Sequence, residues 1–340
     1  MGIIQFPNLF GGLTLYVDRV AFTPFGVPIY WYGLFIAFGF MLSLIMAGYS
    51  ARKFKIKKDD LYDLVLICAP IAIICARLFY VIFDWQTFKN DLGAIFNFRQ
   101  GGLAIYGAVI GAFGAAYLVC KKKKMIPLRV FDFAAPYFAF SQAIGRWGNF
   151  VNQEAFGVNT NLPWGMTGNR IRSYLENQQG LLASQGMQVN PELPVHPTFL
   201  YESLWNMGAF FLLLWLRKNK KVDGEVFFGY MILYGLGRSW IEGLRTDSLM
   251  LGSFRISQLL AIAFVIVFGA LFIYRRRKTP NLEQKEFYDP NFVFAVEETV
   301  KADDQQEHQS EYTDLVLEKR AEAKVNTGHE EEHTENKVEE

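Results

Sequence analysis

Residues 62–83 read YDLVLICAPIAIICARLFYVIF, an apolar run whose charged residues are Asp63 near one end and Arg77 near the other. A helix needs about 20 such residues to cross the hydrocarbon core of a bilayer. The run therefore predicts a membrane-spanning helix. The composition agrees, because hydrophobic residues make up 51% of the chain without Gly. Soluble domains reach about 45–50% with Gly included.

Apolar runs of this length recur, and we predict an all-α integral membrane protein with seven transmembrane helices. The predicted helices cover residues 29–49, 62–83, 102–120, 130–151, 197–216, 225–243 and 256–274. The fourth and sixth are less uniformly apolar because each contains ionisable residues. The three cysteines, Cys68, Cys75 and Cys120, fall inside predicted helices and form no CxxC motif. We expect no metal ion and no other cofactor.

Positive charges orient the predicted helices. Lys and Arg gather in the cytoplasmic loops that flank membrane spans. Each odd-numbered helix is followed by a basic cluster, and these clusters lie within residues 52–58, 121–129, 217–221 and 275–278. We therefore place the N-terminus outside the cell and the C-terminus in the cytoplasm. The first residues lack a basic segment followed by an apolar core, so we expect the first helix to serve as the insertion signal.

Two segments differ in composition from the predicted membrane domain, residues 1–278. Residues 152–195 are rich in Asn, Gln, Gly and Pro and predict a small external head between the fourth and fifth helices. Residues 279–340 are acidic and hold His308, His329 and His333. This composition cannot bury enough apolar surface to fold. We predict a disordered cytoplasmic tail whose histidines are solvated.

Polar and ionisable side chains gather at one level of the predicted helices. A rise of about 1.5 Å per residue places three of them roughly 7–9 Å below the outer boundary. Charged groups at bilayer depth are costly and mark functional sites. Ion pairs that only hold the helices together are the alternative, above all for Arg77 and Glu202. The whole set is Tyr32, Arg77, Tyr106, Arg146, His196, Glu202, Arg238 and Glu242.

Helical spacing brings some of these residues onto common faces. Tyr234, Arg238 and Glu242 recur every four residues and form one stripe. Arg146 and Asn149 also share a face, which Glu154 joins if the helix continues. A guanidinium group binds two phosphate oxygens at once. Two arginines near the headgroup level therefore predict a site for a phospholipid phosphate.

Residues 145–157, GRWGNFVNQEAFG, resemble the signature of the prolipoprotein diacylglyceryl transferases. Four further segments resemble motifs of that family, in the family's order. They are YWYG at 30–33, GGLAIYG at 101–107, HPTFLYE at 196–202 and YGLGRSWIE at 234–242. The resemblance covers roughly residues 25–275 and leaves the acidic tail outside it.

The resemblance implies an enzyme of the bacterial plasma or inner membrane whose active site faces the outer leaflet. Its substrates would be phosphatidylglycerol and secreted preprolipoproteins. The thiolate of a lipobox cysteine would attack the glyceryl carbon that bears the phosphate. The products would be a thioether-linked diacylglyceryl group and glycerol 1-phosphate, the first step of lipoprotein maturation. We expect a monomer and no nucleic-acid partner.

The residues take roles within that reaction. We expect Arg146 and Arg238 to bind the phosphate, because fixed positive charge stabilises the leaving group. The residues expected to support them by binding substrate are Tyr32, Asn149, Asn152 and Tyr234. Glu154 and Glu242 are candidate bases, and His196 at the rim is a third.

One residue departs from the family's pattern. The family usually has a histidine where this chain has Tyr106. The unperturbed pKa of a tyrosine is about 10, so we expect Tyr106 to donate to the phosphate and not to take the thiol proton. Arg77 and Glu202 are expected to be supporting or structural residues.

Three other classes of protein use similar features. A transporter of organic anions would need access from both sides, whereas the cytoplasmic halves of the predicted helices look almost wholly apolar. A phospholipid headgroup transferase would use the same phosphate-binding arginines, and only the motif around Arg146 speaks against it. A rhomboid-like protease would need a Ser–His pair such as Ser239 and His196, but no Gly-x-Ser-x-Gly or Gly-x-Ser-Gly motif surrounds Ser239.

Overall fold

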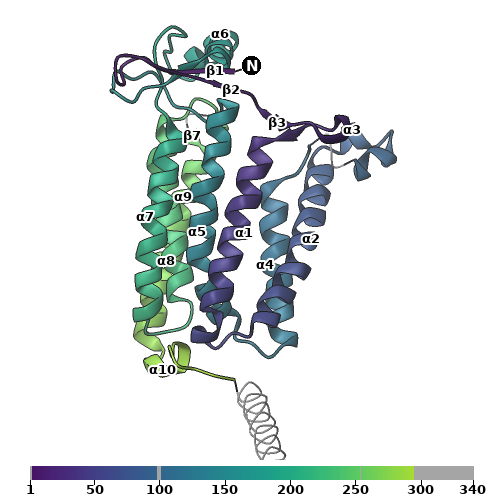
Figure 1. The fold of residues 1–340 in the computed structure, drawn as a ribbon, viewed down its shortest axis with the longest axis vertical. Coiled ribbons are helices and arrows are strands. Elements are labelled where there is room, and N and C mark those ends of the chain that lie inside the picture. The colour runs from purple at the N-terminus through teal and green to yellow at the C-terminus, as the bar shows by residue number, and fades with distance from the viewer. Residues whose placement is uncertain (1, 98–100, 253, 295–340) are drawn as a thin grey trace, which may run out of the picture. The chain divides into compact units, whose positions relative to one another are not determined.

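The computed structural model describes residues 2–97, 101–252 and 254–294. Seven helices in this part of the chain have 18 residues or more, and each overlaps one of the predicted helices (Figure 1). They are α1 Trp31–Ala51, α2 Lys58–Phe83, α4 Ile105–Lys122, α5 Pro127–Asn152, α7 Thr198–Asn219, α8 Glu225–Leu244 and α9 Ile256–Lys278. The shorter helices are η1 Pro24–Gly26, η2 Arg52–Phe54, α3 Trp85–Phe88, η3 Leu92–Phe96, α6 Asn169–Ser184 and α10 Gln284–Phe287.

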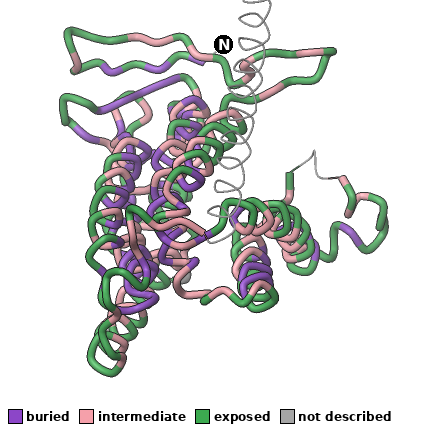
Figure 2. Tube along the Cα trace, turned by 60° about the horizontal axis from the view of Figure 1, so that its bottom comes forward, coloured by how far each residue is buried: buried purple, intermediate pink, exposed green. Residues whose placement is uncertain are grey.

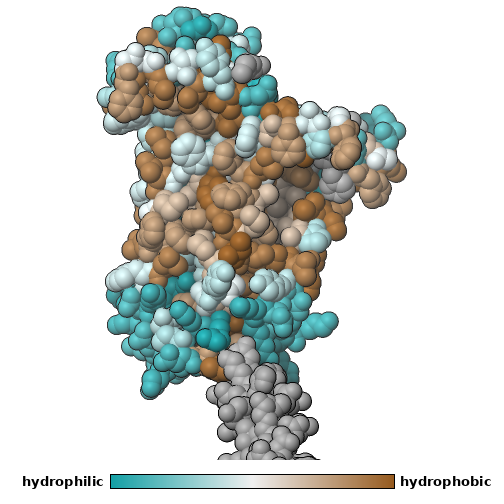
Figure 3. All heavy atoms as spheres, in the orientation of Figure 1, coloured by the Kyte–Doolittle hydropathy of each residue, from teal (hydrophilic) through white to brown (hydrophobic). Residues whose placement is uncertain are grey.

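Five of the long helices are apolar and long enough to cross a membrane, namely α1, α2, α4, α7 and α9. Figure 3 shows a broad hydrophobic band across the face of the helices in view, with hydrophilic residues gathered at both ends. Large apolar side chains such as Leu66 of α2, Leu118 of α4 and Ile266 of α9 are exposed on the long helices. A bilayer accommodates such a surface and water does not. The chain is therefore a multi-pass membrane protein.

The helices pair closely where small residues face a neighbour. Figure 2 shows buried residues along the facing sides of the helices and exposed residues on their outer sides. In the pair α2 and α4, a Cβ atom added at Gly107 would lie 2.4 Å from the carbonyl oxygen of Cys75. Only glycine permits this approach of the two backbones. α5 packs on α1, α7 and α8, and α8 packs on α9.

The head is larger than predicted. Besides residues 152–195 it contains the N-terminal strands β1 Gly2–Phe6 and β2 Leu13–Val17. These pair antiparallel with each other and with β5 Thr167–Gly168, in the order β2-β1-β5. Ile4, Ile171 and Leu175 are fully buried in its core with α6. The shorter strands β3 Val20–Phe22, β4 Ile29–Tyr30, β6 Met250–Leu251 and β7 Phe254–Arg255 form two small antiparallel pairs.

The four basic clusters lie together at the end of the helices opposite the head (Figure 1). We call the two ends the basic end and the head end. A buried group of charged residues lies at the basic end, formed by Asp132 of α5 and by Lys220 and Asp223 between α7 and α8. Lys220 lies 2.8 Å from both Asp132 and Asp223, and all three residues are buried. The pairs satisfy one another, which makes the burial of these charges tolerable.

The helical unit extends beyond the predicted boundary at residue 278. It runs from Met1 to Pro290, and Phe287 of α10 is only 1% exposed. The backbone N–H groups of Leu282 and Asp289 donate to the carbonyl oxygens of Lys221 and Lys53. Residues 279–290 are therefore held against the basic end. The rest of the predicted tail and its three histidines lie almost wholly outside the described residues.

Candidate active site

Three arginine side chains meet at Glu202 of α7, at the head end of the helices. The Glu202 carboxylate lies 2.6 Å from Nη2 of Arg146 and 3.6 Å from Nη1 of Arg238. It also lies 3.3 Å from Nη1 of Arg245, which directly follows α8. Glu202 is only 5% exposed. This one buried carboxylate therefore fixes the positions of three guanidinium groups from two neighbouring elements.

The structure places the predicted stripe on one face of α8. Nη2 of Arg238 lies 2.8 Å from Oε2 of Glu242, one turn further along the helix. Glu242 is 1% exposed. Tyr234 lies one turn on the other side of Arg238, where its ring packs against those of Tyr230 and Phe264. Glu202 and Glu242 together hold Arg238 from both sides.

Glu154 is brought back to α5 by a turn at the helix end. α5 ends at Asn152, and Gln153 adopts a left-handed backbone with φ of 54°. The Glu154 carboxylate then accepts hydrogen bonds from the side-chain amides of Asn149 at 2.9 Å and Asn152 at 3.2 Å. Three residues of the sequence motif thus form one cluster although the helix unwinds.

Tyr32 joins the site from α1 because Gly148 of α5 leaves room for its ring. A Cβ atom added at Gly148 would lie 2.4 Å from Cδ2 of Tyr32. The phenol lies within electrostatic range of both Glu154 and Arg146. Arg146 and Glu154 therefore both lie near Tyr32.

Arg77 is committed to the backbone of another segment. Its guanidinium group has five N–H donors. These donors bond to the carbonyl oxygens of residues 94, 95, 97, 101 and 102, at distances from 2.7 to 3.2 Å. The Arg77 guanidinium therefore binds the backbone of the segment between α3 and α4.

Replacing Arg77 with Lys tests this structural reading. Lysine has three donors and should lose at least two of the five hydrogen bonds, lowering stability by about 2 kcal/mol. We expect a lower Tm in detergent. Transfer by the folded variant should stay within about twofold of wild type, because the lost donors bind the loop. An unchanged Tm with lost transfer would contradict the structural role.

His196 and Tyr106 lie outside the cluster of arginines and carboxylates. The backbone of His196 pairs with Gly157 and Val158, and its Nδ1 lies 3.1 Å from the Tyr201 hydroxyl. Burial lowers the pKa of His196, so its ring is neutral at pH 7. Tyr106 is the second residue of α4, which packs mainly on α2, and it is 53% exposed.

Arg245 is a member of the site that our sequence analysis missed. Its guanidinium binds Asp247 through Nε at 2.8 Å and Nη2 at 2.7 Å, besides contacting Glu202. Burial opposes its charge, but the carboxylates of Asp247 and Glu202 outweigh burial and raise its pKa. The sequence Arg-Thr-Asp was the one local sign of this pairing.

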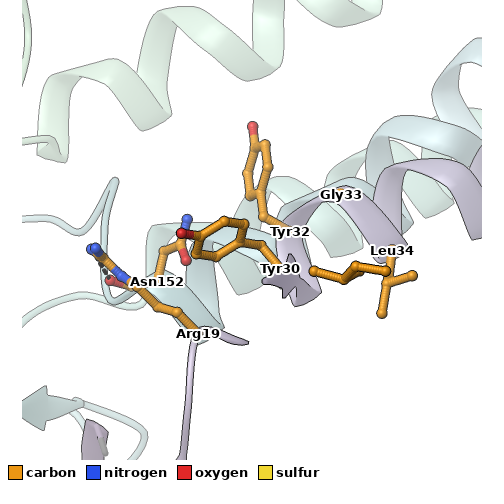
Figure 4. A pocket seen from close by; sticks show the side chains of 7 residues that line it. Arg19, Tyr30, Tyr32, Gly33, Leu34 and Asn152 are labelled. Carbon is orange, nitrogen blue, oxygen red and sulfur yellow. Dashed lines mark hydrogen bonds between the residues drawn. The ribbon is translucent and has the colours of Figure 1, made fainter. Parts of the chain in front are cut away.

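A cavity of about 570 Å³ lies beside the start of α1 and the end of α5 (Figure 4). Two of the predicted substrate-binding residues line it. Its lining consists of Arg19, Ile29, Tyr30, Tyr32, Gly33, Leu34 and Asn152. Tyr32 and Asn152 therefore connect this space with the residues around Glu154 and Arg146.

Comparison with known proteins decides the family. The sequence model described as prolipoprotein diacylglyceryl transferase matches residues 19–274, which contain every residue of the site. The chain belongs to the prolipoprotein diacylglyceryl transferase family. The resemblance of the five motifs is thereby confirmed.

Several relatives in this family are named phosphatidylglycerol–prolipoprotein diacylglyceryl transferase. One from Clostridioides difficile is 43% identical over 265 residues, which is 78% of this chain and 98% of the relative. One from Finegoldia magna is 42% identical over 270 residues, 79% of this chain and all of the relative. One from Bacillus cereus is 44% identical over 269 residues, 79% of this chain and 96% of the relative.

Proposed function

We propose that this diacylglyceryl transferase moves the diacylglyceryl group of phosphatidylglycerol onto the lipobox cysteine of a preprolipoprotein. The thiolate sulfur forms a bond to the glyceryl carbon, and the bond from that carbon to the phosphate oxygen breaks. The electron pair leaves with glycerol 1-phosphate, and the thiol proton passes to a base. The observation that carries this proposal is the meeting of Arg146, Arg238 and Arg245 on one buried carboxylate.

The donors left free on two arginines support a phosphate site. Within the described part of the chain, Arg146 contacts Glu202 through Nη2 and makes no other polar contact. Arg238 uses Nη1 on Glu202 and Nη2 on Glu242. Each guanidinium has five N–H donors, so both retain donors for a phosphate. Arg77, whose donors already bind backbone, does not.

The leaving group gains negative charge as the carbon–oxygen bond breaks. Donors whose positions are already fixed stabilise such charge without reorganising during the reaction. Glu202 and Glu242 supply this fixation, because they hold Arg146 and Arg238 from α7 and α8. We therefore infer that Glu202 positions the arginines and that Glu242 holds Arg238.

Glu154 is the base that the contacts favour. Its Oε1 accepts two amide hydrogen bonds, while its Oε2 makes no hydrogen bond within the described residues. Oε2 is therefore open to a thiol proton. Glu242 is tied to Arg238, and His196 is tied to the head. A thiol has a pKa near 8.5, and the nearby arginines would help to lower it.

The topology belongs to the same proposal. We infer seven membrane spans, with α5 and α8 crossing the bilayer besides the five apolar helices. Both carry ionisable residues, but both pack among other helices, which shields these groups from lipid. The basic end faces the cytoplasm, as positive charge favours. The head end, the N-terminus and the site then face outside. We also propose that the enzyme is a monomer.

The Tyr106→Phe variant tests the residue that departs from the family pattern. Tyr106 is half exposed and belongs to a helix that packs mainly on α2. We expect transfer within about threefold of wild type, because Tyr106 lies outside the cluster of arginines and carboxylates. The rate with saturating phosphatidylglycerol is the measurement. A loss of two orders of magnitude would place the phenol in the chemistry.

A transfer assay tests the function itself. Purified protein is mixed with phosphatidylglycerol and a synthetic lipobox peptide with one cysteine, and the peptide is weighed by mass spectrometry. We expect the peptide to gain one diacylglyceryl group. The matched control peptide carries serine at that position and should stay unmodified, because the oxygen is a poor nucleophile without a stronger base. An unmodified cysteine peptide would contradict the proposal.

A further inference from the structure

The cavity beside Tyr32 and Asn152 contains an arginine that has no role in the proposed reaction. Arg19 lines it from the segment between β2 and β3. Of the residues that line it in the described part of the chain, Arg19 is the charged one. The cavity therefore offers a single positive charge, two phenols and one amide to whatever occupies it.

The Arg19 side chain is anchored but not saturated. Its carbonyl oxygen accepts the N–H of Trp31 at 3.0 Å, which fixes its backbone to the start of α1. Its Nη2 donates to the carbonyl oxygen of Asn152 at 3.3 Å. Figure 4 shows the guanidinium of Arg19 and the hydroxyl of Tyr30 both directed toward Asn152. Within the described residues the other N–H donors of this exposed side chain make no hydrogen bond, so they are free to bind a ligand.

Tyr32 and Asn152 link the cavity to the proposed phosphate site. Asn152 donates to Glu154 through its side chain and accepts from Arg19 through its backbone. Tyr32 lines the cavity and lies within electrostatic range of Arg146. A phospholipid headgroup is attached directly to the phosphate. When the phosphate is bound at Arg146, the space beside Tyr32 and Asn152 is therefore within reach of the headgroup.

We propose that Arg19 selects the lipid by its headgroup, accepting uncharged glycerol and disfavouring cationic ethanolamine. This inference rests on the proposed function. Phosphatidylglycerol and phosphatidylethanolamine share the diacylglyceryl group and the phosphate, so discrimination between them must act on the headgroup. The glycerol hydroxyls accept hydrogen bonds from Arg19, whereas an ammonium group has no acceptor to offer. Two like charges in one cavity also repel each other, which is a specificity device.

A competition assay tests the selection. The full-length enzyme receives the cysteine peptide and equal amounts of the two lipids with identical acyl chains. Transfer from one releases glycerol phosphate and transfer from the other releases phosphoethanolamine, and mass spectrometry measures both. For Arg19→Gln we expect the ratio of phosphoethanolamine to glycerol phosphate to rise about fivefold, since charges at exposed sites are partly screened. Arg19→Lys keeps the charge and should keep a ratio close to wild type.

A matched variant separates the cavity from general surface charge. Arg172 is an exposed arginine of the head that pairs with Glu192 and does not line the cavity. Arg172→Gln removes the same charge and should leave the product ratio unchanged. This inference alone would be overturned if the Arg19→Gln enzyme transferred from phosphatidylglycerol but kept the wild-type ratio of phosphoethanolamine to glycerol phosphate. It would also be overturned if that enzyme released no phosphoethanolamine. A wild-type enzyme that modifies no peptide would overturn the proposed function as well.

Discussion

Replacing Arg146 with Gln is expected to lower transfer from phosphatidylglycerol about 100- to 1000-fold, the usual cost of removing one fixed donor to a developing negative charge. The free donors of Arg146 are the basis of this expectation, because its one polar contact in the described part of the chain is with Glu202. Arg146→Lys should recover only part of the rate, since lysine keeps the charge but lacks the planar fork. Initial rates with the cysteine peptide measure both changes.

The Arg146 variant should remain folded, which separates catalysis from stability. Glu202 keeps two cationic partners after the change, namely Arg238 and Arg245. Its buried charge is therefore not left alone, a situation that would be strongly destabilising. Arg172→Gln serves again as the matched surface control. A folded Arg146→Gln protein with a near-normal rate would remove this residue from the phosphate site.

Replacing Glu154 with Gln is expected to lower transfer about 100- to 10,000-fold at pH 7, the range for loss of a general base. The amide keeps the shape and can still accept the hydrogen bonds from Asn149 and Asn152, so the turn after α5 should persist. The deficit should narrow above about pH 8.5, where the free thiol ionises without help. Rates measured from pH 6.5 to 9.5, relative to wild type, test this.

Glu242→Gln is the matched control for the base. Glu242 holds Arg238 at 2.8 Å, so its loss should weaken the phosphate site at every pH. We expect a deficit that stays constant as the pH rises. A constant deficit in Glu154→Gln, together with a narrowing one in Glu242→Gln, would exchange the roles of the two carboxylates.

Local sequence patterns were sufficient for the long helices. Each apolar run is about as long as a membrane span, and hydropathy reports this without any knowledge of neighbours. The N-terminal part of the head could not be found in this way. β1 has five residues and its partner β5 has two, about 160 residues further along the chain. Such short, distant pairs leave almost no periodic signal.

The same distinction, between patterns within one element and contacts between elements, applies to the candidate site. The positions of Arg238 and Glu242 on one face follow from spacing within one helix. The meeting of Arg146, Arg238 and Arg245 on Glu202 depends on how α5, α7 and α8 are rotated against each other, which spacing does not report. The hydrogen bonds of Arg77 likewise depend on where the backbone between α3 and α4 lies. Pairing between elements therefore determines which partner each charged residue binds.

The bond that breaks is the central claim, and an oxygen label reports it directly. Phosphatidylglycerol is prepared with ¹⁸O in the oxygen that joins the diacylglyceryl carbon to phosphorus, and the products are weighed after transfer. Attack of the thiolate on carbon predicts that the label leaves in glycerol 1-phosphate, in equal amount to the diacylglyceryl peptide formed. Label retained in free diacylglycerol would show attack at phosphorus and would contradict the account.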